Sequence, residues 1–180
     1  MGVSIPVITA CSGFLLAVLW MDLMFDVQVL AHWHAAELPE AAIASVAGYY
    51  HRVTTASRPM SHLVAGVMAI LLITLGLRVA SGRDPLWLVV VSVPLAVVPI
   101  LLALLRTVPN AVRLGRRAGS PAEQTRRARS ICLDHLLCVG CLVLFVGFWL
   151  GYAATLAISS PCSDRASTAP SHRPGSAIPR

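Results

Sequence analysis

An uninterrupted run without charge, from Leu86 to Leu105, limits what this chain can fold into. About 20 apolar residues in a helix cross the roughly 30 Å of hydrocarbon in a bilayer. Similar uncharged runs cover Val3 to Met21, Leu63 to Leu77 and Leu136 to Ile158. Charged residues make up only 12% of the chain and the mean hydropathy is +0.76, whereas soluble domains carry about 25% charge. The sequence therefore predicts an all-α polytopic membrane protein, a four-helix transmembrane bundle.

The expected spans cover about residues 3–30, 60–79, 86–105 and 130–158, and they form one domain over residues 1–158. The second run is short, so we expect it to begin near Met60 and to let Arg78 reach the interface. Pro94 and Pro99 predict a kink in the third span. Residues 159–180 are rich in Ser, Pro, Ala and Arg, a composition that predicts a disordered C-terminal tail.

Two segments outside the spans have helical signatures. Ser120-Pro121-Ala122-Glu123 has the pattern of a capping box with proline in the first turn, and it predicts a helix that continues through Arg129 into the fourth span. The stretch from Glu40 to Ser57 carries apolar residues at helical spacing, namely Ile43, Val46, Ala47 and Tyr50. We expect a short cytoplasmic interfacial helix there.

All 14 basic residues are arginines, which points to a GC-rich bacterial genome. They are densest between the third and fourth spans, at Arg106, Arg113, Arg116, Arg117, Arg126, Arg127 and Arg129. The positive-inside rule places this loop in the cytoplasm. We therefore expect a multi-pass protein of the bacterial inner (plasma) membrane with both termini outside.

The expected partners follow from the same distribution of arginine. The arginines follow the ends of apolar runs and form no face with stacking aromatics, so nucleic acid is not an expected partner. The lipid bilayer, a second copy of the chain or another membrane protein is expected instead.

Polar side chains gather at the predicted inner edge of the bundle. Such groups are costly in a membrane and therefore candidates for function. They are Asp22, Asp26, Arg106, Asn110, Asp134 and His135. We take Asp22, Asp26, Arg106, Asn110 and His135 as candidate catalytic residues.

Asp22 and Asp26 lie one helical turn apart and repel each other unless a cation or a proton lies between them. A structural ion-pair network with Arg52, Arg58 or Arg106 is one solution, and a proton or ion path is another. A metal site is the third, because Asp22, Asp26, Asp134 and His135 have ligand types that suit iron or manganese. The sequence specifies no cofactor.

Small residues mark the fourth span. Gly140, Gly147 and Gly151 form a small-residue stripe that predicts close helix packing or dimerisation. Cys138 and Cys141 form a C-x-x-C pair like that in the last helix of vitamin K epoxide reductase relatives. Those enzymes also need a second, loop-borne pair, which Cys11 and Cys162 do not supply. A packing role is therefore expected for these cysteines.

The segment Thr107-Val-Pro-Asn-Ala-Val-Arg-Leu114 resembles the Pro-x-Asn-x-x-Leu signature of small bacterial anthrone-oxygenase-like membrane proteins. A histidine after an arginine-rich run opens their fourth span, as His135 does here. The two sequences differ in that Pro109 and Asn110 are adjacent in this chain. The resemblance implies a four-helix membrane fold and functional roles for Asn110 and His135.

Two functional hypotheses follow. The first is a non-enzymatic accessory or structural membrane protein that packs through its glycine stripe. The second is a small membrane-embedded oxidoreductase or oxygenase that acts on a lipophilic substrate at the cytoplasmic interface. Convergence of the polar candidates on one cavity would favour the second.

Overall fold

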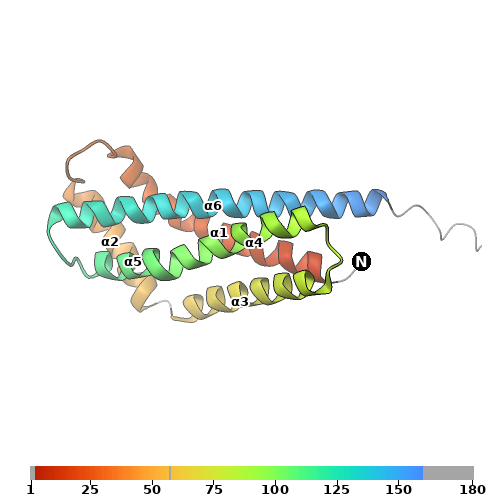
Figure 1. Ribbon diagram of the computed structural model, residues 1–180. Coiled ribbons are helices and arrows are strands. Elements are labelled where there is room, and N and C mark those ends of the chain that lie inside the picture. The colour runs from red at the N-terminus through yellow and green to blue at the C-terminus, as the bar shows by residue number, and fades with distance from the viewer. Residues whose placement is uncertain (1–2, 57, 160–180) are drawn as a thin grey trace, which may run out of the picture.

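The computed structural model of the chain describes residues 3–56 and 58–159, and these residues are helical, without strands. The elements are α1 (Ser4–Ala31), α2 (Glu40–Thr55), α3 (Arg58–Ser81), α4 (Leu86–Leu102), a π-helical turn η1 (Ala103–Thr107), α5 (Val108–Gly115) and α6 (Pro121–Ile158). Figure 1 shows α6 running the length of the molecule, with the start of α1 at the same end as the last turns of α6. From residue 160 onward, the predicted tail lies outside the described residues.

Four segments are long and apolar enough to cross a membrane: Ser4–Ala31, Pro59–Ser81, Leu86–Gly115 and Pro121–Ile158. This confirms the all-helical architecture with four candidate spans. The third candidate span extends beyond the prediction, because α4, η1 and α5 follow one another without a break. With 38 residues, α6 is roughly 57 Å long, nearly twice the thickness of the hydrocarbon layer. Part of α6 therefore has to lie outside that layer in any membrane.

The start of α6 has the capping box that the sequence predicts. The Ser120 hydroxyl accepts from the Glu123 amide at 3.3 Å, and the Glu123 carboxylate accepts from the Ser120 amide at 3.2 Å. These two bonds satisfy amide groups that a helix start otherwise leaves unpaired. The helix can therefore begin three turns before the polar residues Asp134 and His135.

The four long segments pack as a ring. α1 contacts α6 and α3, and α4 contacts α6 and α3. Across the ring, the described residues of α1 and α4 have no Cα atoms within 8 Å of each other, and neither do those of α3 and α6. The centre of the ring is therefore left for side chains or for a cavity.

Buried apolar residues form two separate cores. The bundle core lies toward the termini and contains Ile5, Ile8, Leu15, Leu71, Leu75, Leu88, Ala96, Leu142, Phe145 and Trp149. The cap core lies at the other end, where α2 and α5 pack against α1 and α6, and contains Val29, Leu38, Ile43, Val46, Ala47, Tyr50, Ala111, Leu114, Ala128, Ile131 and Cys132. The predicted helix after Glu40 is thus present as α2, and its apolar face is buried in the cap core.

A charged cluster, which we call the Arg78 clamp, closes the bundle at the end near the termini. The Arg78 guanidinium forms a two-pronged ion pair with Asp84, with 2.8 Å between Nε and Oδ2, and its Nη1 donates to Ser4 Oγ at 2.9 Å. It also lies 5.2 Å from the centre of the Trp149 ring. The clamp therefore joins α1, α3, the turn before α4, and α6.

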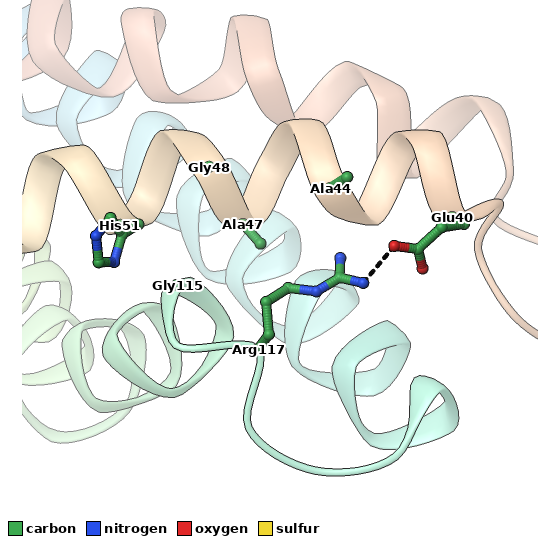
Figure 2. A pocket seen from close by; sticks show the side chains of 7 residues that line it. All are labelled: Glu40, Ala44, Ala47, Gly48, His51, Gly115 and Arg117. Carbon is green, nitrogen blue, oxygen red and sulfur yellow. Dashed lines mark hydrogen bonds and ion pairs between the residues drawn. The ribbon is translucent and has the colours of Figure 1, made fainter.

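A glycine allows the close approach of α2 and α5. A Cβ atom at Gly115 would lie 2.8 Å from the backbone nitrogen of His51; Figure 2 labels both residues. The atoms nearest to this Cβ, from His51 and Tyr50, all belong to backbone and cannot move aside as a flexible side chain can. Gly115→Ala is therefore expected to cost about 1–3 kcal/mol of stability by overpacking. Gly48→Ala is the matched control, because a Cβ there meets nothing within 4 Å. Unfolding in detergent micelles measures both; equal stability of the two variants would contradict the packing described here.

Candidate functional site

A cavity of about 630 Å³ lies inside the helix ring, between the bundle core and the cap core. Its walls come from all four long segments and from α2, which contributes Tyr49 and Val53. Pockets of about 300–1,000 Å³ are typical of sites for small organic molecules. This space is open because the helices on opposite sides of the ring, α1 and α4 as well as α3 and α6, do not approach each other closely.

The cavity is apolar over most of its wall and polar at the end next to the cap. The apolar wall includes Phe14, Leu15, Val64, Met68, Leu71, Ile100 and Leu142, and the polar end includes Asp22, Tyr49, Ser61, Thr107 and His135. Among the side chains that the structure describes, no arginine lines the cavity, and the chain has no lysine. A molecule with a long apolar part and a small polar head matches this shape and chemistry.

His135 is held by a buried carboxylate. Its Nδ1 lies 2.6 Å from Oδ2 of Asp26, whose side chain is fully buried. The Tyr50 hydroxyl donates to the other oxygen of Asp26 at 2.9 Å. With Asp26 as acceptor, Nδ1 carries a proton and the second nitrogen, Nε2, is available at the cavity. A histidine oriented in this way by a carboxylate is the usual arrangement for general acid–base chemistry.

Asp22 lies beside the free nitrogen of His135. Its Oδ2 is 4.0 Å from His135 Nε2, too long for a direct hydrogen bond. The Tyr49 hydroxyl donates to its Oδ1 at 2.5 Å, and the Tyr49 ring stacks on Phe25 with 3.9 Å between ring centres. The cavity therefore has one carboxylate oxygen and one imidazole nitrogen close together at its polar end.

The two tyrosines of α2 serve as hydrogen-bond donors to the two carboxylates of α1. Burial, together with the hydrogen bond and the charge of Asp22, raises the pKa of Tyr49 well above its ordinary value. Burial and the charges of Asp26 and Asp22 raise the pKa of Tyr50 in the same direction. Both phenols stay protonated at physiological pH and hold the carboxylates as hydrogen-bond donors.

A second polar group lies beside the cavity, across η1 and α6. Asp134 Oδ2 is 3.2 Å from the Thr107 hydroxyl, and its Oδ1 is 3.4 Å from Arg106 Nε. Ser130 Oγ accepts from Arg106 Nε at 3.0 Å and from Asn110 Nδ2 at 3.5 Å. Arg106 is half exposed and neither residue is among the cavity lining, so Arg106 joins η1 to α6 and Asn110 joins α5 to α6.

The π-helical turn places Thr107 between the two polar groups. Pro109 lacks the N–H that would bond the carbonyl of Leu105, which loosens the helix at this point. π-helical turns occur often at functional sites. Thr107 can donate to the carbonyl of Leu102 at 3.3 Å or to Asp134, and it also lines the cavity.

The sequence-predicted candidates thus divide into two groups. Asp22 and His135 line the cavity, and Asp26 lies directly behind His135. Of the ion-pair partners expected for the two α1 carboxylates, Arg106 pairs with Asp134 and Arg52 is exposed, whereas the side chain of Arg58 lies outside what the structure describes. Tyrosines bond Asp22 and Asp26. Tyr49, Tyr50 and Thr107 were not among the candidates, although the Tyr-Tyr pair in an apolar helix face was a usable signal.

Within the described residues, no set of three His, Cys, Asp or Glu side chains is arranged to hold a metal ion. The set Asp22, Asp26, Asp134 and His135 is instead divided, since Asp134 bonds Thr107 and Arg106. Cys138 and Cys141 are free thiols, and Cys138 lines the cavity. Cys162 lies outside the described residues.

The glycine stripe of α6 faces outward. A Cβ atom at Gly140, Gly147 or Gly151 would meet no atom within 4 Å, so no other helix of this chain packs closely on them. Leu137, Val143 and Leu144 are exposed on the same helix. Packing through these glycines, as the sequence predicts, would therefore need a second protein chain.

A shallower groove of about 500 Å³ lies outside the bundle, between α2 and the turn before α6 (Figure 2). Its floor consists of Ala44, Ala47 and Gly48, and its two charged side chains pair with each other, with 2.5 Å between Arg117 Nη2 and Glu40 Oε1. Arg117 has a positive φ of 54°, which is rare for a residue other than glycine. The ion pair gives this strained turn a structural role.

The cavity opens toward the outside of the bundle. Met60 at the start of α3, and Leu104 and Val108 on the opposite wall, line the cavity and are also exposed. These three side chains are apolar. An apolar mouth of this kind suits entry from a hydrocarbon phase rather than from water.

No family model, curated protein or solved structure matches this chain. Its function therefore has to be argued from the cavity and from the His135–Asp26–Tyr50 chain.

Proposed function

We propose that this protein binds a lipophilic molecule taken from the bilayer and holds the polar head of that molecule at His135. The observation that carries the proposal is the orientation of His135: Asp26 and Tyr50 hold one side of it, and the other side faces an apolar cavity of about 630 Å³. A buried polar group is costly unless it has a partner. The Nε2 atom of His135, at the end of an apolar cavity, therefore suits a ligand with one polar end.

The same arrangement supports acid–base chemistry on the bound molecule. Asp26 fixes the position of the imidazole ring, and Nε2 is the nitrogen that can accept or donate a proton at the ligand head. An oxidoreductase or oxygenase activity, as the anthrone-oxygenase resemblance implies, is a narrower form of this proposal. It would use the same cavity and the same histidine.

A non-enzymatic accessory role is the second candidate. The outward-facing glycines of α6 favour it, because small residues on a lipid-facing helix allow close approach of another helix. The two candidates differ in their dependence on the cavity. An accessory protein that acts through α6 would not respond to substitutions that fill the cavity.

Filling the cavity is the experiment that tests the proposal. Binding of radiolabelled n-dodecanol to the detergent-solubilised protein is expected to weaken at least tenfold in Ala65→Phe, because Ala65 lines the cavity on α3. Tenfold corresponds to about 1.4 kcal/mol. Ala96→Phe, on the neighbouring helix α4, is expected to act in the same direction.

Ala69→Phe is the matched control, since Ala69 is exposed one turn further along α3 and does not line the cavity. Dodecanol binding at wild-type strength in both Ala65→Phe and Ala96→Phe would rule out the cavity as the binding site.

We further propose that the cap faces the cytoplasm of a bacterial cell and that both termini of the chain face outward. The support is the concentration of arginines on α5, on the turn that follows it, and on the first turns of α6. The short cytoplasmic helix α2 would then lie at the inner interface.

Cysteine labelling tests this orientation. In a Cys162→Ser background, Ser81→Cys is expected to react with a membrane-impermeant maleimide in intact cells, and Ala118→Cys only after permeabilisation. Both positions are exposed and lie at opposite ends of the molecule. The reverse pattern would show that the cap faces outward.

A further inference from the structure

The charges around the polar end of the cavity do not balance. Asp22 and Asp26 are two carboxylates, and His135 is the cationic partner that both of them approach. Asp134 adds no uncompensated negative charge, because Arg106 lies 3.4 Å from it and compensates its charge. Among the side chains described at this end of the cavity, two carboxylates therefore face one cation even when His135 is protonated.

The excess carboxylate is the one that the cavity exposes. Asp26 is fully buried behind the imidazole, whereas Asp22 lines the cavity and is partly exposed. The Tyr49 hydroxyl occupies one oxygen of Asp22, and the other lies 4.0 Å from His135 Nε2. Oδ2 of Asp22 can therefore take a further hydrogen-bond donor from the cavity.

The rest of the wall selects against negative charge. No arginine is among the lining side chains that the structure describes, and Asp26 already compensates the charge of a protonated His135, so an anionic head such as a phosphate or a carboxylate would meet the uncompensated carboxylate of Asp22. Charges in an environment of low dielectric constant interact strongly, whether they attract or repel. A cationic head attached to an apolar chain is complementary both to this end of the cavity and to its apolar remainder.

We propose that the cavity binds amphiphilic amines in their ammonium form, with the ammonium group paired to Asp22 and the apolar chain directed toward the bundle core. This rests on the proposed function, since it assumes that the cavity holds a lipophilic molecule. With the ligand in place, two cations, the ammonium and the protonated His135, balance two carboxylates. Binding involves no covalent step. Hydrogen bonds from the ammonium N–H groups to Asp22 replace those that the same groups donate to water.

Three ligands with the same chain and different heads test the proposal. Binding of dodecylamine, n-dodecanol and dodecanoate is measured on the full-length protein in dodecyl maltoside micelles, with Ala65→Phe in parallel to correct for partition into the micelle. We expect dodecylamine to bind at least about tenfold more tightly than dodecanol, because a hydrogen bond between two charged groups is stronger than one between neutral groups. Dodecanoate is expected to bind most weakly.

Two variants assign the preference to Asp22. In Asp22→Asn, the affinity for dodecylamine is expected to fall to that for dodecanol, whereas Asp22→Glu, which keeps the charge, is expected to keep the order of the three ligands. Both variants must retain the cooperative thermal transition of the wild type. If Asp22→Asn does not, the order of the three ligands on the wild type and on Asp22→Glu decides.

The outcomes separate the two proposals. Equal affinities for the three heads in the wild type would overturn the preference for ammonium while leaving the lipophilic site intact. A preference that persists in Asp22→Asn would also overturn it. No binding of any of the three ligands above the Ala65→Phe background would overturn the lipophilic site itself, and this inference with it.

Discussion

His135→Ala is expected to lower the free energy of unfolding by about 3–5 kcal/mol, the cost typical of removing one partner of a buried charge pair. The reason is Asp26, whose side chain is fully buried and would keep only the Tyr50 hydroxyl as a partner. Reversible unfolding in mixed micelles, followed by tryptophan fluorescence, measures the loss.

Asp26→Asn in the His135→Ala background is the informative second variant. Asparagine removes the buried charge, so the double variant is expected to regain part of the stability, with a coupling of about 0.5–3 kcal/mol between the two positions. His62→Ala is the control for histidine removal, because His62 is exposed on α3. A loss as small in His135→Ala as in His62→Ala would show that Asp26 does not depend on the imidazole.

Arg78→Ala is expected to have the second large effect, also about 3–5 kcal/mol, because it leaves a buried carboxylate without its partner. The side chain of Asp84 is only 1% exposed, and Arg78 contacts both of its oxygens. The substitution also removes the hydrogen bond to Ser4 and the contact with the Trp149 ring. Thermal unfolding in detergent, with hydrogen exchange over the turn before α4, measures the effect.

Arg83→Ala is the matched control for the clamp. Arg83 lies in the same turn, is exposed, and its removal is expected to change stability by no more than about 0.5 kcal/mol. Arg78→Lys is expected to fall between the two, because lysine keeps the charge but lacks the planar fork that bonds both oxygens. Equal effects of Arg78→Ala and Arg83→Ala would contradict a stabilising role for the clamp.

The helices were predictable from the sequence because their causes are local. Uncharged runs identified the four candidate spans, and the Ser120–Glu123 capping box identified the start of α6, since both signals lie within the segment that they describe. The continuation of the third span through Thr107 to Gly115 was not predicted. Arg106 and Pro109 are the ordinary signals for the end of a span, but here Asp134 and Ser130 bind Arg106 and the helix continues as a π turn.

The location of the candidate site was predictable from the sequence, but the hydrogen-bond partners within it were not. Asp22, Asp26 and His135 were identified because polar groups in apolar helices are rare, but Asp26 and His135 are 109 positions apart, and no local pattern joins them. The choice of tyrosine over arginine has a geometric cause. Successive helical residues point about 100° apart, so Tyr50 faces the cap core while Arg52, two residues on, lies on the exposed side of α2.

The helix ring without diagonal contacts also has a consequence for the response of this protein to hydrostatic pressure. Protein interiors are normally packed as densely as organic crystals, and voids that disappear on unfolding make the unfolded state smaller in volume. The cavity of about 630 Å³ leaves part of the centre of this bundle without protein atoms. The bundle without a ligand should therefore be more compressible than the bundle with one, because a bound molecule would fill the cavity and raise the packing density of the interior.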